Sequence, residues 1–337
     1  MTISPSLSVL MPVFNSERFV AEAIGSILSQ SFKDFEFLIL DDASTDKSFG
    51  IIKDFGKKDL RIKVFQNEKN LGVVESRNKL INLSKGKYIA WLDSDDIALK
   101  NRFEVQIKFL EEHPEIGMVG AYPIIIDENS KKTGQWWFET NPQKLKIELF
   151  FHSPFLSSSV MIRKSCLPQN FYDSKFPVAE DFDLYSKISE HSDAANISEF
   201  LVKYRINSKG LSKSNTEKME QLAVQVIKEH AERLGIKLEE STIKHLRKPK
   251  TASKIAFEEI TEIEKSLILL KNLLLEKSHF DKTVICEIIQ KYWFETCRKS
   301  THNGLKILKI FFKPPLFCKK LSLRDNCRLL VRTLIKF

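Results

Sequence analysis

Residues 88–96, with the sequence YIAWLDSDD, decide the fold of this chain. The first five form a short apolar run typical of a buried strand, and three carboxylates follow within four residues, at Asp93, Asp95 and Asp96. Carboxylates crowded at the end of a buried strand repel one another unless a cation, hydrogen-bond donors or a raised pKa relieves the repulsion. A divalent ion shared between carboxylates, water and phosphate would do so, and the stretch therefore predicts a metal and phosphate site.

The Asp-x-Asp pattern alone has a plainer interpretation. It occurs twice, at Asp93/Asp95 and Asp181/Asp183, and a shuffled chain with 16 aspartates would contain roughly one match by chance. Acids after a strand also occur in ordinary turns and helix caps. The surrounding chain must therefore decide between a turn and a functional site.

Three segments before this stretch are also predicted to be strands. Residues 7–13, 35–40 and 61–66 predict strands, and each is followed by a helical pattern. Strands that alternate with helices predict a Rossmann-like α/β fold, with a mainly parallel central sheet flanked by helices. Ligands of such sheets bind beyond the carboxyl ends of the strands, where this chain concentrates its polar residues.

The pattern is mixed after a helix expected over residues 99–112. Strands are expected over residues 116–122, 124–126, 157–163 and 199–206, a loop or edge strand over 135–138, and a short helix from residue 179. From residue 212 onward the chain has helical spacing, which predicts a helical C-terminal extension.

Composition describes an ordinary soluble protein, with 42% hydrophobic and 29% charged residues. No apolar run approaches the roughly 20 residues needed to span a bilayer, and no secretory signal opens the chain, so we expect a cytoplasmic protein. The five cysteines are scattered and include no C-x-x-C pair, which argues against a disulfide framework or a zinc site.

The net charge of +9 lies in the C-terminal part. Residues 1–211 have a net charge of −2 and residues 212–337 a net charge of +11. The final stretch, residues 305–337, interleaves Leu, Ile and Phe with Lys and Arg. This pattern is typical of segments that lie on anionic membranes. The alternative is a basic helix that packs on its own domain. No nucleic-acid module accompanies the charge, so no nucleic-acid partner is expected.

Six segments together resemble family 2 inverting glycosyltransferases with the GT-A fold. They are SVLMPVFN, DDASTD, NLGVVESRN, LDSDD, SSSVMIRK and EDFDLYSKI, in the family's order and approximate spacing over about residues 5–211. The resemblance implies a nucleotide-sugar-binding and catalytic domain at residues 1–211. Residues 212–337 lie outside it and are expected to form a basic region for membrane association or acceptor binding.

The resemblance also implies a set of nucleotide-sugar-binding residues, which are Pro12, Val13, Phe14, Asn15, Asp41, Asp42, Asn70, Gly72, Arg77, Asp93 and Ser94. Residues 12–15 offer a backbone edge and an apolar wall to a flat base. Asp42, in preference to Asp41, would accept hydrogen bonds from the base or ribose. Arg77 would neutralise the diphosphate, although an Arg on an amphipathic helix usually faces solvent.

For the chemical step, the resemblance assigns Asp95 and Asp93 to a Mn²⁺ or Mg²⁺ ion and Asp181 to the catalytic base. Asp181 in an ordinary protein would be an acid favoured by a helix dipole. Asn207 stands where the family often has a histidine, which puts an extra metal or phosphate contact there in doubt. Trp136 and Trp137 are candidates for an acceptor platform, with core packing as the alternative.

The expected activity is metal-dependent transfer of a sugar, from a nucleotide diphosphate sugar such as a UDP-sugar, to a glycan or lipid-linked acceptor in cell-surface polysaccharide synthesis. Two rivals stay open. A sugar-1-phosphate nucleotidyltransferase would be expected to carry a glycine-rich basic loop after the first strand, which Pro12 to Asn15 are not. A non-catalytic protein that binds nucleotide sugars or membranes would share the fold without turnover.

Overall fold

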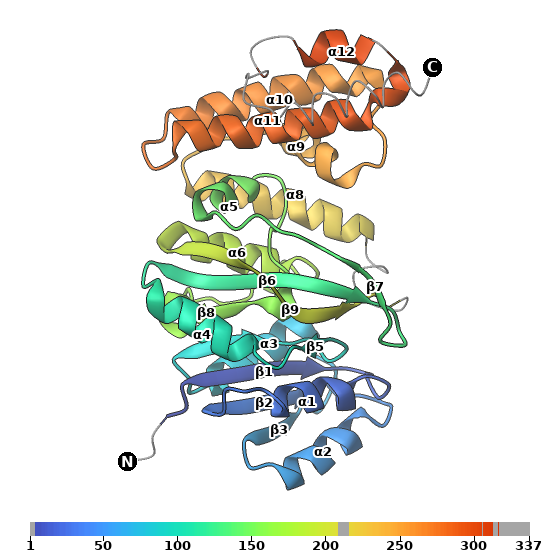
Figure 1. Cartoon of the computed structure of the whole chain (residues 1–337), viewed down its shortest axis with the longest axis vertical. Coiled ribbons are helices and arrows are strands. Elements are labelled where there is room, and N and C mark those ends of the chain that lie inside the picture. Colours follow the sequence, from blue (N-terminus) through green and yellow to red (C-terminus); the bar gives the residue numbers. More distant parts are fainter. Residues whose placement is uncertain (1–3, 208–215, 305, 313–315, 317–337) are drawn as a thin grey trace. The chain divides into compact units, whose positions relative to one another are not determined.

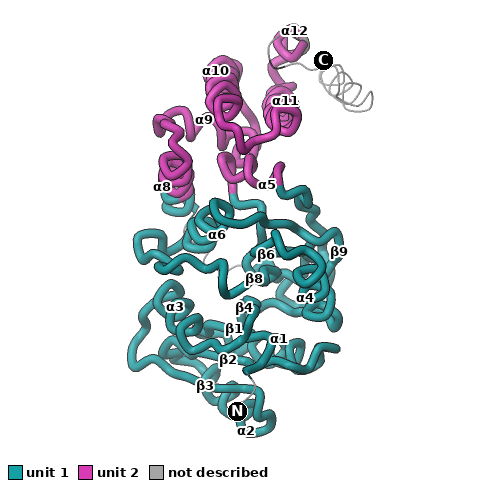
Figure 2. The backbone as a smooth tube through the Cα atoms, turned by 90° about the vertical axis from the view of Figure 1, so that its left-hand side faces the viewer, with its two compact units in different colours: residues 1–142, 153–222 teal, residues 143–152, 223–337 magenta. Residues whose placement is uncertain are grey.

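The computed structural model describes residues 4–207, 216–304, 306–312 and 316 (Figure 1). The chain divides into two compact units (Figure 2). The first comprises residues 1–142 and 153–222, and the second comprises residues 143–152 and 223–337. Sequence alone places a boundary between residues 211 and 212 and gives no sign that residues 143–152 join the C-terminal helices.

Strands and helices alternate in the first part of unit 1. They are β1 (Leu7–Val13), α1 (Val20–Leu28), β2 (Phe35–Asp41), α2 (Ser48–Lys58), β3 (Ile62–Gln66), α3 (Val73–Leu83) and β4 (Tyr88–Trp91). The four strands pair in parallel in the order β3-β2-β1-β4. Every residue of β1 except Pro12 and all of β2 and β4 are buried, as expected for strands covered on both faces. The predicted parallel sheet flanked by helices is confirmed.

Right-handed crossovers decide which face each helix covers. From β1 to β3 the chain moves across the sheet in one direction, and α1 and α2 pack together. It then returns past β2 and β1 to form β4, and the connecting helix α3 lies on the opposite face from α1 (Figures 1 and 2). The order reverses between β1 and β4, and this reversal is where doubly wound sheets bind ligands.

The second part of unit 1 extends the same sheet. Its elements are β5 (Ile97–Ala98), α4 (Arg102–Glu112), β6 (Ile116–Ile126), β7 (Lys132–Gln135), η1 (Ser157–Ser159), β8 (Met161–Arg163), η2 (Lys164–Cys166), α6 (Glu180–His191) and β9 (Asp193–Arg205). The sheet continues from β4 as β8-β6-β9-β5, and β7 pairs with β6. β8 is antiparallel to both neighbours, whereas β6 and β9 run parallel.

Two strand predictions in this part are wrong. Residues 116–122 and 124–126 form one continuous strand, because register shifts around Tyr122 and Pro123 let β6 pass a residue that has no N–H group. Residues 157–163 begin as a short 3-10 helix, and the strand covers only Met161–Arg163. The Ser159 hydroxyl donates to the Leu156 carbonyl at 2.8 Å, a local hydrogen bond that competes with strand formation.

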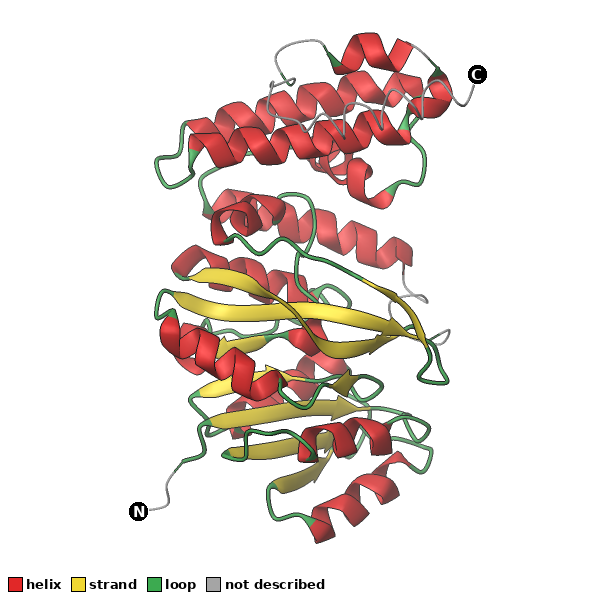
Figure 3. Ribbon diagram, in the orientation of Figure 1, coloured by secondary structure: helices red, strands yellow, loops and turns green. Residues whose placement is uncertain are grey.

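The C-terminal part is helical (Figure 3). With α5 (Pro142–Glu148), its helices are α8 (Thr216–Arg233), α9 (Glu240–Thr251), α10 (Phe257–Leu275), α11 (Lys282–Lys299) and α12 (Lys306–Phe311), with η3 (Thr301–Asn303) before the last. α10 buries Ile260, Ile263, Leu267, Leu270 and Leu274, the spacing of one helix face. The helical extension predicted from the sequence is confirmed for the described residues.

Residues 143–152 belong to unit 2 through specific contacts. The Phe151 ring stacks on Tyr292 of α11 with centroids 3.6 Å apart, and Arg247 of α9 donates to the Phe151 carbonyl at 2.9 Å. Most of the basic segment at residues 305–337 lies outside the described residues. Where the helices are described, none combines the length and apolar character that a membrane span requires.

Candidate functional site

The loops after β1, β2 and β4 meet at the point where the strand order reverses. The Ser94 hydroxyl donates to Ser16 Oγ at 3.0 Å, which joins the end of β4 to the end of β1. The loop after β2 locks onto the loop after β1, because Thr45 N–H donates to Asn15 Oδ1 at 2.8 Å and Ser16 N–H donates to Ser48 Oγ at 2.8 Å. These contacts bring the predicted strand-end residues to one edge of the sheet.

Asp42 holds the loop after β3 with both carboxylate oxygens. The Asn67 side chain and Leu71 N–H donate to Oδ1 at 2.8 and 2.9 Å, and Gly72 N–H donates to Oδ2 at 2.8 Å. Gly72 has a φ of 85°, a conformation that favours glycine, and it precedes the first turn of α3. Asn70 in this loop is exposed and Asn67 is buried, so it is Asn67 that anchors the loop to Asp42.

Asp41 differs from Asp42 in its surroundings. Its Oδ2 accepts from Ser44 N–H at 3.1 Å and from the Gln66 side chain at 3.2 Å, while its buried Oδ1 has no hydrogen-bond partner among the described residues. Asp41 is fully buried at the end of β2. Asp42 is therefore the aspartate of the pair that holds the loop after β3, whereas Asp41 contacts Ser44 and Gln66.

Two large apolar side chains near Asp42, those of Phe14 and Leu71, are exposed. Asp42 N–H donates to the Val13 carbonyl at 2.7 Å, and the next residue, Phe14, is 49% exposed. On the other side, Asp42 binds Leu71, which is 44% exposed. Exposed Phe and Leu beside a carboxylate provide an apolar surface with a hydrogen-bond acceptor, as a flat heterocyclic base requires.

Arg77 joins the two acidic motifs. It is only 3% exposed, so the alternative of a solvent-facing Arg on α3 is wrong. One guanidinium nitrogen donates to Asp93 Oδ1 at 3.0 Å, and the other lies 3.2 Å from Glu180 Oε1. The guanidinium also lies over the rings of Trp91 and Tyr172, at 5.2 and 5.5 Å from their centroids. Its charge is therefore held by the protein's own carboxylates and aromatic faces.

The next residue of α3, Asn78, fixes the neighbouring loop. Its amide nitrogen donates to the Tyr172 carbonyl at 2.9 Å, and its Oδ1 accepts from Tyr172 N–H at 3.0 Å. The Tyr172 ring in turn packs edge-on against Trp91 of β4. Arg77 and Asn78 thus position the side chains and backbone that enclose the end of β4.

Asp93 is held from the opposite side by Ser158 of η1. The Ser158 hydroxyl donates to Asp93 Oδ2 at 3.0 Å, and Asp93 N–H donates to Ser158 Oγ at 3.1 Å. Both carboxylate oxygens of Asp93 consequently have a partner, with Arg77 on one and Ser158 on the other.

Arg205 at the end of β9 secures the residues after Asp93. Its side chain donates to the Asp95 carbonyl at 2.7 Å, and its backbone N–H donates to Asp96 Oδ1 at 2.7 Å. The Asn207 side chain donates to the Asp95 carboxylate. Burial, and next the charge of Asp93, raise the pKa of Asp95 to about 6. Asn207 thus contacts the motif at the position where the family often has a histidine.

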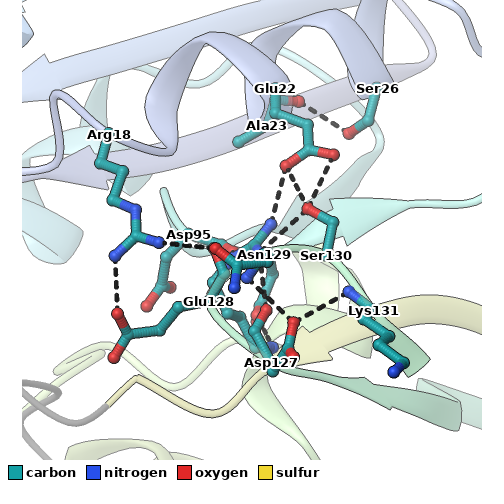
Figure 4. Close-up of polar contacts among 12 residues, drawn as sticks. Arg18, Glu22, Ala23, Ser26, Asp95, Asp127, Glu128, Asn129, Ser130 and Lys131 are labelled. Atoms are coloured by element: carbon teal, nitrogen blue, oxygen red, sulfur yellow. Dashed lines mark hydrogen bonds and ion pairs between the residues drawn. The ribbon is translucent and has the colours of Figure 1, made fainter. Parts of the chain in front are cut away.

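Arg205 also connects this motif to the turn between β6 and β7. Its guanidinium donates to the Asp127 carbonyl at 2.9 Å, to Ser130 Oγ at 3.0 Å and to Glu22 of α1 at 2.8 Å. Figure 4 shows Glu22, Asp127 and Ser130 beside Asp95, together with Arg18, which donates to Glu128 at 2.6 Å. The network fixes the backbone at Asp95 from three separate segments.

Glu180 and Asp181 begin α6. Burial raises the pKa of Glu180 to about 7, against the opposing effect of the Arg77 charge. Burial likewise raises the pKa of Asp181, whose Oδ1 accepts from Phe182 N–H at 2.7 Å. A carboxylate with a raised pKa is a stronger base, and the Arg77 bridge brings this pair to the acidic end of β4.

The donor set at the end of β4 fits a divalent ion of the Mg²⁺ or Mn²⁺ type. The described residues include no group of three or more His, Cys, Asp or Glu side chains that would enclose a metal. Such ions need only one or two carboxylates when substrate phosphates and water fill the other positions. Burial contributes most to the raised pKa of Asp95, and the neighbouring charge of Asp93 contributes next; a cation would relieve that crowding of negative charge.

Several residues of this site are missed by sequence reasoning. Ser158, Arg205, Asn67 and Tyr172 all contact the predicted residues, and Glu22 completes the network. Ser158 stands inside the SSSVMIRK segment and Arg205 two residues before Asn207, but nothing in the sequence shows that either side chain points to the site.

Known proteins are similar to this chain in sequence. A family model described as glycosyl transferase family 2 matches residues 8–167. An uncharacterized glycosyltransferase of Methanocaldococcus jannaschii is 37% identical over 234 residues, which are 67% of this chain and 79% of the relative. A UDP-Glc:α-D-GlcNAc-diphosphoundecaprenol β-1,3-glucosyltransferase of Escherichia coli is 29% identical over 63% of this chain and 82% of its own length.

Solved structures show the same fold at low sequence identity. The S. aureus TarS structure in complex with UDP is 20% identical, with a TM-score of 0.57 over 86% of this chain and 90% of that one. A mannosyltransferase from Pyrobaculum calidifontis, in complex with GDP-Man and Mn²⁺, is 12% identical with a TM-score of 0.52 over 99% of this chain and 88% of that one. The predicted GT-A fold is confirmed.

Proposed function

This chain belongs to glycosyl transferase family 2, and from that premise we propose that it transfers a sugar, with inversion, from a nucleotide diphosphate sugar to a hydroxyl group of a glycan or lipid-linked acceptor. The observation that carries the proposal is the Arg77 bridge, which brings together Asp93 and Glu180 from two motifs that are far apart in the sequence. Leaving-group binding and proton removal then occur in one enclosed site.

The nucleotide would occupy the edge beside Asp42. Phe14 and Leu71 provide apolar contact for the base, and Asp42 accepts a hydrogen bond from it or from the ribose. Oδ1 of Asp42 already accepts two hydrogen bonds from the loop after β3, whereas Oδ2 accepts one, so the second lone pair of Oδ2 is available to the nucleotide. Pro12, Val13, Asn15, Asp41, Asn70, Gly72 and Ser94 complete this proposed nucleotide site. The UDP complex of TarS supports a uridine nucleotide.

Asp95, with Asp93, would hold the divalent ion. When bound, such an ion offsets the negative charge that develops on the departing diphosphate. The Mn²⁺ in the mannosyltransferase structure supports this part of the proposal. Arg77 is enclosed by Asp93 and Glu180, so we assign it to positioning these carboxylates and not to binding phosphate.

Asp181 would be the base. Its carboxylate takes the proton from the acceptor hydroxyl, the acceptor oxygen bonds to the anomeric carbon, and the bond from that carbon to the diphosphate oxygen breaks with its electron pair. The nucleoside diphosphate leaves from the opposite face, and the configuration inverts. Arg77 stabilises the ionised form of Asp181, which must be unprotonated to act.

The acceptor class rests on the Escherichia coli relative, whose name specifies a diphosphoundecaprenol-linked sugar. We propose a lipid-linked or glycan acceptor in surface polysaccharide synthesis, reached from the cytoplasmic face of the membrane. The membrane contact predicted for residues 305–337 concerns a segment that lies mostly outside the described residues and remains a prediction from sequence.

A donor screen tests the proposal. We expect one or a few nucleotide sugars, with Mn²⁺ present, to raise the melting temperature and to release nucleoside diphosphate when a competent acceptor is added. Release of pyrophosphate from a nucleoside triphosphate and a sugar phosphate would indicate a nucleotidyltransferase instead. Donor binding without turnover across a broad acceptor panel would favour the non-catalytic alternative.

Replacing Asp42 with Asn should weaken nucleotide binding. The amide group of the variant would place its own N–H group opposite the backbone N–H of Leu71 or Gly72. One charge-assisted hydrogen bond of the native carboxylate would therefore be lost. We expect the Kd for UDP to rise about tenfold in calorimetry, since 1.4 kcal/mol corresponds to that factor. Asp54→Asn, an exposed acid on α2, is the control and should bind UDP normally. Equal Kd values for the two variants would remove Asp42 from the nucleotide site.

A further inference from the structure

The two tryptophans after β7 are exposed. Trp137 is 68% exposed and Trp136 42% exposed, so core packing is the wrong interpretation of this pair. The other two tryptophans of the chain, Trp91 and Trp293, are fully buried. Large aromatic side chains of a soluble protein are usually buried, and an exposed group of them in one place indicates a binding surface.

A second row of aromatic side chains holds the pair in position. The Trp136 ring packs against Tyr204 of β9, with centroids 5.5 Å apart. The Trp137 ring packs edge-on against Phe200 at 6.2 Å, and Phe200 packs against Tyr122 of β6 at 5.7 Å. We call Tyr122, Trp136, Trp137, Phe200 and Tyr204 the aromatic patch.

Backbone contacts fix the chain on both sides of the tryptophans. Trp136 N–H donates to the Pro123 carbonyl of β6 at 3.2 Å. Beyond Trp137, the Asn196 side chain donates to the Glu139 carbonyl at 2.9 Å and to the Pro154 carbonyl at 3.1 Å. The exposed rings thus stand on a chain anchored to the sheet, and a ligand would not have to order them.

The aromatic patch lies close to the proposed catalytic site along β9, with the Tyr204 and Arg205 side chains on opposite faces of the strand. Tyr204, which contacts Trp136, is followed by Arg205, which binds the Asp95 carbonyl, and then by Asn207, which binds the Asp95 side chain. Three extended residues span at most about 11 Å, so the patch begins within a short distance of the residues assigned to the metal. A ligand extending along β9 from the reaction centre would reach it.

We propose that the aromatic patch binds sugar rings of the acceptor glycan, beyond the sugar that receives the transferred residue. This inference rests on the proposed function. Sugars present C–H groups that stack on the negative face of an aromatic ring, while their hydroxyl groups need polar neighbours. Thr133 and Gln135 of β7 and Glu199 of β9 supply such polar groups on the adjoining strands.

Trp137→Ala should lower the affinity for acceptor glycans and leave the donor site intact. A printed array of bacterial glycans identifies a binding glycan, and tryptophan fluorescence then gives its Kd in the presence of UDP, since only the exposed pair can be perturbed from the surface. We expect the Kd to rise about fivefold in Trp137→Ala, because one aromatic contact is worth roughly 1 kcal/mol. The affinity should recover in Trp137→Phe and be unchanged in Leu60→Ala, another exposed apolar position.

Three results of this experiment would overturn the proposal. These are no glycan binding by the wild-type protein, equal Kd values in the wild type and Trp137→Ala, or tryptophan-dependent binding to phosphatidylglycerol vesicles but not to glycans. The last would make the patch a membrane contact. Failure of the proposed function is distinguishable, because it appears as lost UDP binding or lost donor turnover in the wild-type protein itself.

Discussion

Asp181→Asn is expected to lower kcat about 10²–10⁴-fold, the usual contribution of a positioned general base. The amide has nearly the shape of the carboxylate but cannot take the proton of the acceptor hydroxyl. Donor binding does not require that proton transfer, so the Kd for UDP should stay within about threefold of the wild-type value. Slow hydrolysis of the donor by water, measured without acceptor, should persist. Single-turnover transfer and calorimetry measure the two effects separately.

Asp183→Asn is the control, because Asp183 belongs to the same helix and the same Asp-x-Asp pattern. Its carboxylate is fully buried and lies 2.6 Å from Lys187 Nζ, one turn further along α6. We therefore expect this variant to melt at a lower temperature but to keep kcat per folded molecule. If Asp181→Asn and Asp183→Asn reduced kcat equally, or if Asp181→Asn transferred at the wild-type rate, Asp181 would not be the base.

Arg77→Met should destabilise unit 1 more than any other single change in the site. It leaves Asp93 and Glu180 without their shared cation, and removing one partner of a buried ion pair costs about 3–5 kcal/mol. Because the Asp93 side chain is one-third exposed, we expect the free energy of unfolding to fall by about 3 kcal/mol and the melting temperature to fall by about 6–12 °C. Differential scanning calorimetry gives the shift.

Arg61→Met is the matched control, since Arg61 pairs with Asp59 at 2.6 Å and also lies over an aromatic ring, but nearer to solvent. Such a pair contributes about 0–1 kcal/mol. Arg77→Lys should fall between the two, because an ammonium group keeps the charge but cannot reach both carboxylates as a fork does. Equal melting temperatures for Arg77→Met and Arg61→Met would show that Arg77 does not hold the two motifs together.

The fold of the N-terminal half is predictable because each strand carries its own signal. An apolar run that ends in polar residues, repeated four times between helical patterns, predicts the parallel sheet and the edge at which its loops meet. β6 is harder, because Pro123 interrupts a pattern that the structure continues through a register shift. The assignment of residues 143–152 to unit 2 depends on Phe151 and Tyr292, which are far apart in sequence.

The candidate site is also only partly predictable from the sequence. Asp93, Asp95 and Asp181 are candidates because six segments together resemble one family, since the Asp-x-Asp pattern alone is expected about once by chance. Arg77 has the sequence setting of a surface Arg, and only its burial and its two carboxylate partners reveal a positioning role. The role of Arg205 is equally hard to predict from the sequence, because five of its hydrogen bonds are with residues about 75 or more positions away. Long-range hydrogen bonds leave no local pattern.

The most direct test of the central claim, that Asp95 supports metal-dependent transfer from a nucleotide sugar, is single-turnover transfer by the wild-type protein and Asp95→Ala with EDTA and with added Mn²⁺. We predict that EDTA abolishes wild-type transfer and that Mn²⁺ restores it. Asp95→Ala should be slower by about 10²–10³-fold at saturating Mn²⁺, the size of losing one group that stabilises developing charge. Near-native transfer by Asp95→Ala, or wild-type transfer that is unaffected by EDTA, would contradict the claim.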